Sequence, residues 1–240
     1  MGIAGFSSWL DKKYPSIIQP CIEENEQTSN FDGVEVDNLY LDMNEIIYLC
    51  ANLDDLSILK SEDEIIQGVF QYIDEIFSII RPRNLIYILY NYAKKHPSDN
   101  EQFTKCDIKP GTMLMSKLSD ELRSYIHDRM NSIPAWKSII VILSDANAPD
   151  EGEHKIMDFI RTQKFSNSNT NHVLFSGDFD VILLGLTMHP DNVRIMRRKT
   201  NEIEVYTFRD LKLLREEIKN EFMGNLERKI YHPLNLVKRM

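Results

Sequence analysis

Acidic side chains follow several of the short apolar runs in this 240-residue sequence. The run NLYLD ends on Asp42, and the run IIVIL leads through a turn-rich stretch to Glu151 and Glu153. The run HVLF leads through Ser-Gly to Asp178 and Asp180. If these runs are parallel strands of one sheet, their carboxyl ends meet where ligands bind in such sheets. We therefore expect the five carboxylates to converge on one site.

The spacing of Glu151 and Glu153 restricts how they can share that site. Residues two apart in a helix lie about 200° around its axis, so both face one point only if Glu151 precedes the helix. Pro149 and Gly152 permit such a start. Carboxylates at a helix start are often simple caps, and this alternative stays open for either acidic pair taken alone.

The five carboxylates taken together favour bound cations. Converging negative charges disfavour ionisation unless something neutralises them. Sites made only of oxygen ligands suit Mg²⁺ or Mn²⁺. Two such ions close together stabilise the attacking and leaving oxygens when a phosphodiester is cleaved. The sequence thus predicts a site for two divalent cations.

Strand-like and helix-like segments alternate along the chain. The strand candidates are 39–41, 85–90, 138–144, 173–175, 193–196 and 204–207, and the helix candidates are 44–58, 62–80, 112–131, 153–164, 180–188 and 208–222. This alternation predicts an α/β fold, a mostly parallel twisted sheet flanked by helices on both faces. We expect one domain over 1–240, with 223–240 as a basic tail or a truncated edge. Trp9 and Trp136 are expected to anchor the core.

Composition excludes several classes of protein. The net charge of −9 argues against a protein that coats nucleic acid nonspecifically. No apolar run is long enough to span a membrane, and the N-terminus lacks the pattern of a signal peptide. Three widely spaced cysteines are typical of reduced thiols, so we expect an intracellular location, cytoplasmic rather than nuclear. The basic residues at 194 and 197–199 fit either an RNA-backbone contact or a solvated cluster on an edge strand.

Longer segments around the same acidic residues resemble a known family. The stretches MGIAGFSSWLDKKYP, DNLYLDMNEIIYLC, IKPGTMLMSKL, DEGEHKIMDFIR, GDFDVILLGLTMH and YTFRDLKLLREEI resemble segments of the N-terminal nuclease region of XRN-type 5′→3′ exoribonucleases. The resemblance implies a fold like that of PIN domains and flap endonucleases. It also implies Mg²⁺-dependent, processive hydrolysis of single-stranded RNA that carries a 5′-monophosphate. On this basis the catalytic metal ligands are Asp42, Glu151, Glu153, Asp178 and Asp180.

The resemblance extends to RNA-binding positions, with some departures. Tyr48 stands where the family stacks an aromatic ring or His on the terminal base. The family's basic segment that grips the 5′-phosphate is reduced here to Lys94, Lys95, Gln102 and Lys105. Asn91 replaces a metal-binding Asp, although its carbonyl oxygen can still serve as a ligand. A further Asp of the family, in a GNDF-like segment, has no counterpart in the 240 residues, so this ligand is either lost or lies beyond position 240.

Two principal hypotheses follow for function. The first is an active 5′→3′ exoribonuclease that acts at single-stranded RNA 5′ ends with two bound cations. The alternative is a catalytically impaired family member that binds RNA ends or a protein partner, which the altered ligand positions motivate. A third, minor reading is an unrelated use such as DNA flap cleavage or scaffolding. Retention of five mutually repelling carboxylates favours activity, because a chain freed from catalysis has no structural reason to keep them. The sequence identifies no protein partner and indicates no membrane association.

Overall fold

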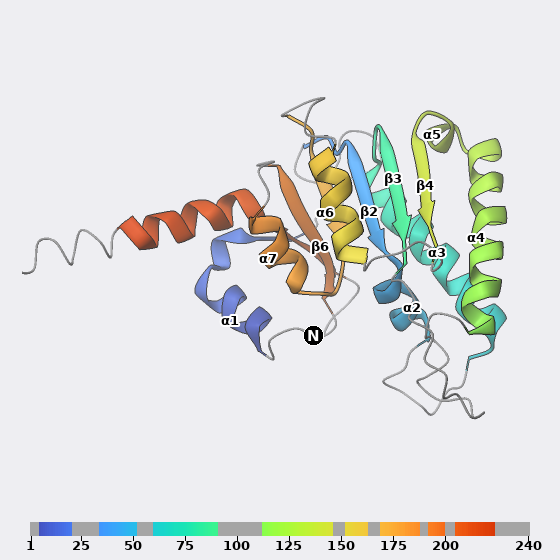
Figure 1. The fold of residues 1–240 in the computed structure, drawn as a ribbon, viewed down its shortest axis with the longest axis horizontal. Coiled ribbons are helices and arrows are strands. Elements are labelled where there is room, and N and C mark those ends of the chain that lie inside the picture. The colour runs from blue at the N-terminus through green and yellow to red at the C-terminus, as the bar shows by residue number, and fades with distance from the viewer. Residues whose placement is uncertain are drawn as a thin grey trace, which may run out of the picture.

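A seven-stranded sheet organises the described part of the chain (Figure 1). The computed structural model describes residues 5–20, 34–51, 60–90, 112–145, 152–162, 169–187, 192–199 and 205–223. The strands are β1 (Ile18–Pro20), β2 (Asn38–Asp42), β3 (Leu85–Leu89), β4 (Ile140–Ser144), β5 (His172–Phe175), β6 (Val193–Lys199) and β7 (Val205–Asp210). Their order is β1-β7-β6-β5-β2-β3-β4. Strands β2 to β6 pair in parallel, and β7 and β1 add antiparallel strands at one side. The predicted α/β class and mostly parallel sheet are confirmed.

Helices cover both faces of this sheet. They are α1 (Phe6–Lys13), the 3-10 turn η1 (Pro15–Ile17), α2 (Met43–Ala51), α3 (Glu62–Ile80), α4 (Met113–Ser132), α5 (Pro134–Lys137), α6 (Gly152–Thr162), α7 (Asp180–Leu186) and a helix over 211–223. In Figure 1, α6 and α7 cross the near face, and α3 lies behind the strands. Among the described helices, none is long and apolar enough to cross a membrane.

The central strands are apolar on both sides because both sides are covered. Leu39 and Leu41 of β2 pack in a core with α2, α3, α4 and α5. Tyr40, between them, packs in a second core with α1, α6, α7 and the helix over 211–223. Successive side chains of a strand point to opposite faces, so a strand buried on both sides needs a continuous apolar run. This is why β2 and β3 are buried at every position.

The order of the strands creates a topological switch point between β2 and β5. From β2 the chain moves through β3 to β4, with α2 to α5 on one face, and then returns through α6 to β5 and β6 on the other side of β2. Adjacent strands β2 and β5 therefore send their outgoing connections to opposite faces. Ligands of open α/β sheets bind at such a switch point, beyond the carboxyl ends of the strands.

The long helix α3 shows how local sequence determines an element. Ser61 and Glu64 form a reciprocal capping box at its start, which satisfies backbone donors that a helix leaves unpaired. The buried face of α3 includes Ile66, Val69 and Ile73, at the spacing of one helical stripe. Its predicted bounds, 62–80, match the structure.

Several predicted boundaries were wrong, and long-range pairing explains the clearest case. The helix predicted from 208 begins at 211, because Phe208 and Asp210 pair with β6 and extend β7. The strand predicted from 138 begins at Ile140. The short helices α1 and α5 were not predicted as elements. Trp136 is 1 % exposed and anchors the core as expected, whereas Trp9 is 51 % exposed. The expectation that Trp9 is buried was therefore wrong.

A buried histidine at the start of β5 should make stability depend on pH. Burial lowers the pKa of His172 from 6.5 to about 4, and its Nδ1 lies 3.0 Å from the Tyr40 hydroxyl. Between pH 6.5 and pH 4, the imidazole of His172 therefore binds a proton in the unfolded chain more readily than in the folded chain. The free energy of unfolding should then fall as pH drops from 6.5 to 4, by roughly 3 kcal/mol from this residue.

The test compares urea unfolding at pH 7 and pH 4.5 for the native chain and for His172→Gln, which cannot titrate. We expect the pH-dependent loss to be smaller in His172→Gln. His127→Gln serves as the matched control, because the side chain of His127 is 79 % exposed on α4. Equal pH dependence in the native chain and His172→Gln would contradict the prediction.

Candidate metal and nucleic-acid site

Asp42 lies at the switch point, at the last position of β2, and is 8 % exposed. Its Oδ2 accepts a hydrogen bond from Ser176 Oγ at 3.0 Å. Its Oδ1 accepts from the backbone N and the side-chain Nδ2 of Asn44, at 3.1 and 3.2 Å. Burial raises the pKa of Asp42, and the nearby charge of Asp178 adds to this rise. The carboxylate is therefore held in one orientation in a place that disfavours its charge.

The loop after β5 brings a second carboxylate beside the first. Ser176 is 1 % exposed, and its Oγ also accepts a hydrogen bond from the backbone N of Asp178 at 3.1 Å. Ser176 thus joins the ends of β2 and β5. The Oδ1 of Asp178 accepts from the backbone N of Asp180 at 2.9 Å. This last bond reaches the first residue of α7, whose N-cap residue Phe179 makes no side-chain cap hydrogen bond.

Helix α6 brings a third acidic residue from a different strand connection. Glu153 lies in the first turn of α6. Two residues later, Lys155 Nζ donates a hydrogen bond to the carbonyl oxygen of Tyr90 at 3.0 Å. Tyr90 directly follows β3, so this bond fixes the start of α6 beside the carboxyl end of that strand. The start of α6 and the end of β3 therefore meet here.

Asp42, Glu153 and Asp178 line one open groove with a volume of about 420 Å³. Its lining residues are Asp42, Asn44, Glu45, Tyr48, Glu153, Gly177, Asp178 and Phe179. Four of the predicted site residues, Asp42, Tyr48, Glu153 and Asp178, thus come together as the sequence predicts, and Tyr48 is 41 % exposed. Asp180 is the first residue of α7 and is not among the residues that line the groove. The predicted site residues Asn91, Lys94, Lys95, Gln102, Lys105 and Glu151 lie outside the described residues.

The groove contains one acidic residue that sequence reasoning missed. Glu45 lies in the first turn of α2 and lines the groove. Burial raises its pKa, the charge of Arg197 lowers it, and the charges of Asp42 and Asp178 raise it further. The signal was present in DMNE, because α2 begins directly after Asp42 and a residue three positions on returns to the same side of the helix.

The basic residues of β6 do not form the single patch that both sequence interpretations assumed. Strand β6 lies between β5 and β7, so it is not an edge strand. Arg194 pairs with Asp210, and Arg198 lies over the Tyr72 ring. Arg197 instead faces the site, where it donates to the carbonyl oxygen of Gly177 and lies 3.9 Å from the Phe179 ring centroid. Adjacent strand positions point to opposite faces, which splits the cluster.

The donors in the groove fit Mg²⁺ or Mn²⁺ in chemical type. Its carboxylates, those of Asp42, Glu45, Glu153 and Asp178, offer only oxygen ligands. Burial disfavours the charge of two of them, and a bound cation would remove that penalty. Within the described residues, no three acidic, His or Cys side chains are grouped closely enough to hold one ion. The full ligand set, which includes Glu151 and Asn91, stays a prediction.

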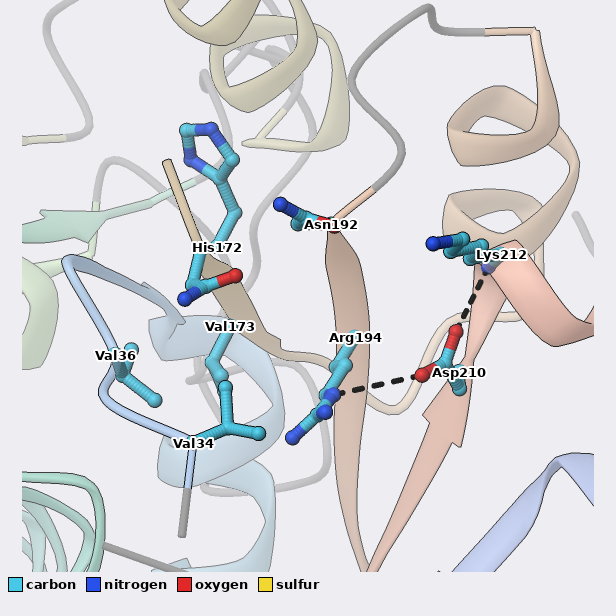
Figure 2. Close-up of a pocket in the computed structure, with 9 residues that line it drawn as sticks. Val34, Val36, His172, Val173, Asn192, Arg194, Asp210 and Lys212 are labelled. Carbon is cyan, nitrogen blue, oxygen red and sulfur yellow. Dashed lines mark hydrogen bonds and ion pairs between the residues drawn. The ribbon is translucent and has the colours of Figure 1, made fainter. Parts of the chain in front are cut away.

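A smaller cavity of about 40 Å³ lies at the opposite end of the sheet (Figure 2). Arg194 and Asp210 form an ion pair at 3.6 Å within it, and the ring of His172 points away from that pair. A volume of this size holds about one water molecule. It is therefore too small for a nucleotide, and the groove beyond β2 and β5 is the better candidate.

Removing the Ser176 hydroxyl should loosen the link between the two strand ends. We expect Ser176→Ala to lower the free energy of unfolding by about 1–2 kcal/mol, because a buried carboxylate loses a donor. In a double-mutant cycle with Asp42→Asn, measured by urea unfolding, the two changes should couple by about 1 kcal/mol. Ser132→Ala, which removes an exposed hydroxyl on α4, is the control. Additive effects of the two site changes would contradict the direct link.

Comparisons with known proteins agree with this geometry. Residues 1–91 and 89–199 match the model of the XRN 5′-3′ exonuclease N-terminus. The chain is 38 % identical to 5′-3′ exoribonuclease 2 of Gallus gallus and 38 % identical to its homologue in Drosophila melanogaster, over 83 % of its length in each case. It spans only 27 % and 28 % of those relatives.

Structural similarity supports the same fold. The catalytic core of Rad2, solved in complex with DNA substrate, matches 91 % of this chain and 57 % of its own chain with a TM-score of 0.50 and 14 % sequence identity. At that identity the likeness concerns the fold alone. The extent of the family match decides the assignment. The chain belongs to the XRN 5′-3′ exonuclease N-terminus family.

Proposed function

We propose that this chain is the nuclease region of a metal-dependent 5′→3′ exoribonuclease that acts on single-stranded RNA with a 5′-monophosphate. One observation carries the proposal. Asp42, Glu153 and Asp178 come from three separate strand connections and line one groove at the switch point of the sheet. Membership in the XRN family supports the reaction type and the RNA substrate.

The residues of the groove would bind the cations and orient the RNA. Asp42, Glu153 and Asp178, with Glu151, Asp180 and Asn91 beside them, would hold two divalent cations. Such cations, when bound, stabilise charge on the attacking and leaving oxygens of the phosphodiester. Ser176 and Asn44 hold the Asp42 carboxylate in place, so it requires little reorganisation. The exposed ring of Tyr48 would stack on the terminal base.

The 5′ end of the substrate would be selected by a basic segment. Lys94, Lys95, Gln102 and Lys105 supply four side chains that can donate hydrogen bonds to phosphate oxygens. A 5′-monophosphate offers these donors negative charge that a 5′-hydroxyl lacks. We therefore propose that the monophosphate end is preferred. We also propose one nuclease domain over 1–240 and a cytoplasmic rather than nuclear location.

The alternative is a catalytically impaired family member that binds RNA ends or a protein partner. Asn91 favours it, because an amide oxygen carries no charge and holds a divalent cation more weakly than a carboxylate does. The two proposals share the groove, but the exoribonuclease cleaves the RNA that it binds, whereas the impaired member only binds RNA ends or a protein partner.

A time course of nucleotide release separates the two functions. The substrates are single-stranded RNAs of one sequence with a 5′-monophosphate or a 5′-hydroxyl, in Mg²⁺ or Mn²⁺. The proteins are the native chain and Glu151→Gln/Glu153→Gln. The exoribonuclease predicts mononucleotide release from the monophosphate substrate, lost in the double variant. RNA binding without release, unchanged by the double variant, would instead identify the impaired family member.

A further inference from the structure

Strand β6 continues past the point where the neighbouring strand β5 ends, and Arg197 is the first residue beyond that point. Met196 pairs with Phe175, the last residue of β5, whereas Arg197 pairs with β7 and has no partner among the described residues of β5. The chain that leaves β5 therefore passes beside Arg197. Its residues 177–179 line the groove, and the middle one is Asp178.

Arg197 contacts the residues on both sides of Asp178. It donates a hydrogen bond from Nη2 to the carbonyl oxygen of Gly177. The centre of the same guanidinium lies 3.9 Å from the centroid of the Phe179 ring. A charged donor strengthens the first contact, and the positive charge over the ring strengthens the second. One side chain thus binds the backbone before Asp178 and the ring after it.

We propose that Arg197 is a positioning residue that holds residues 177–179 against β6 and so keeps the Asp178 carboxylate in the groove. The inference rests on the proposed function, in which Asp178 is a metal ligand, and adds a residue that acts through it. Arg197 is not among the residues that line the groove. It therefore acts on the reaction through Asp178 rather than by contact with the RNA.

The other hydrogen bonds of this segment fix Asp178 only in part. Ser176 Oγ accepts from the backbone N of Asp178, and Asp178 Oδ1 accepts from the backbone N of Asp180. Both bonds join residues two apart in sequence, so they shape the turn without fixing its place on the sheet. Ser176 fixes the start of the segment through its bond to Asp42. Arg197, which is paired within the sheet, fixes the residues that follow.

The charges around Arg197 favour the same arrangement. Burial lowers the pKa of its guanidinium, and the negative charges of Glu45, Asp11 and Asp178 act against that change. A charge that is buried without such partners is costly. Asp178 also acts as a like charge on Glu45. The guanidinium therefore opposes a repulsion that would otherwise displace residues 177–179 from the groove.

The first test separates kcat from KM for mononucleotide release from 5′-monophosphorylated RNA in Mg²⁺. We expect Arg197→Met to lower kcat about 10²-fold, because a small displacement of a reacting group can cost that much. KM should stay within about threefold of the native value, since no RNA contact is removed. Arg197→Lys keeps the charge without the planar guanidinium, so it should recover part of the lost kcat. A raised KM with native kcat would overturn the proposal and identify Arg197 as an RNA contact.

Arg194→Met is the matched control for the loss of an arginine from β6. Arg194 is also partly buried and pairs with Asp210, but it lies at the opposite end of the sheet from the groove (Figure 2). The kcat of this variant should equal that of the native chain even if its Tm falls. Equal losses of kcat in the two variants would show a general effect of β6 and would overturn the proposal.

Hydrogen exchange reports the position of the segment without metal or RNA. The backbone amides of Asp178 and Asp180 are the donors of the two local bonds, so their exchange rates, measured by NMR, report how often the segment opens. We expect exchange at least about tenfold faster at both amides in Arg197→Met. The amides of Val69 and Ile73, inside α3, should exchange as in the native chain, which verifies the fold. Native exchange rates at Asp178 and Asp180 would overturn the proposal.

The two tests distinguish failure of this inference from failure of the proposed function. If the native chain releases no nucleotide, the exoribonuclease function is wrong, and hydrogen exchange alone decides whether Arg197 positions the segment. If the native chain releases nucleotide and Arg197→Met matches it in kcat, the function stands and only the role of Arg197 is wrong.

Discussion

Asp178→Asn is expected to reduce mononucleotide release from 5′-monophosphorylated RNA by about 10³-fold, comparable to removal of one transition-state-stabilising group in other enzymes. Asp178 lines the groove beside Asp42, and its charge acts on both Asp42 and Glu45. The substitution removes a charge that divalent cations require. It keeps an oxygen at the position that accepts the backbone N–H of Asp180, so the start of α7 should be preserved.

The measurement is a single-turnover time course in saturating Mg²⁺, with circular dichroism to verify the fold. Asp128→Asn is the matched control, because the side chain of Asp128 is 78 % exposed on α4, and its rate should equal that of the native chain. If the native chain releases no nucleotide, Mn²⁺ affinity becomes the readout, with at least about a tenfold loss expected. A variant within threefold of the native chain on both readouts would exclude Asp178 from the metal site.

Asp11→Ala is expected to lower the free energy of unfolding by about 3–5 kcal/mol, because it leaves a buried guanidinium without its counterion. Arg209 of β7 is 6 % exposed. It donates from Nε and Nη2 to the two carboxylate oxygens of Asp11 on α1, at 2.8 and 2.5 Å. Its Nη1 has no hydrogen-bond partner in the described part of the chain. The pair therefore holds α1 against the sheet.

Urea unfolding of the single variants and of Asp11→Ala/Arg209→Met distinguishes the contribution of the ion pair to the free energy of unfolding from that of side-chain packing. The double variant should recover most of the stability lost in Asp11→Ala, since it removes the uncompensated charge as well. Asp120→Ala, whose side chain is 75 % exposed on α4, should change stability by less than about 0.5 kcal/mol. A loss below about 1 kcal/mol in Asp11→Ala would show that the ion pair contributes little.

The Asp11–Arg209 ion pair also lies close to a residue that lines the groove. The guanidinium of Arg209 lies 5.9 Å from the Phe179 ring centroid, and that ring lines the groove with Arg197 against it. Loss of α1 docking in Asp11→Ala should therefore affect the site as well as global stability. We expect Mn²⁺ affinity to fall in Asp11→Ala under conditions where the chain remains folded.

The sequence by itself determined the fold class and the acidic chemistry. Continuous apolar runs such as the one ending at Asp42 predict strands buried on both sides, and the alternation with helical patterns predicts the parallel sheet. Carboxylates directly after those runs must lie at one edge of a parallel sheet, wherever each strand stands in the order. That rule predicted that Asp42 and Asp178 share one region, with Glu153 following another strand more distantly, and all three line the groove.

Tertiary structure decided the features that depend on which segments become neighbours. Residues 208–210 have a helical pattern, yet backbone pairing with β6 and β1 makes 208–210 a strand. Basic residues of β6 are close in sequence but point to opposite faces, so Arg197 contacts Gly177 and Phe179 of the groove, whereas Arg194 and Arg198 contact Asp210 and Tyr72. Glu45 enters the groove because Gly177, 132 positions away, has no side chain to exclude it. Such contacts join residues distant in sequence, so the pattern of one segment does not determine which distant segment it meets.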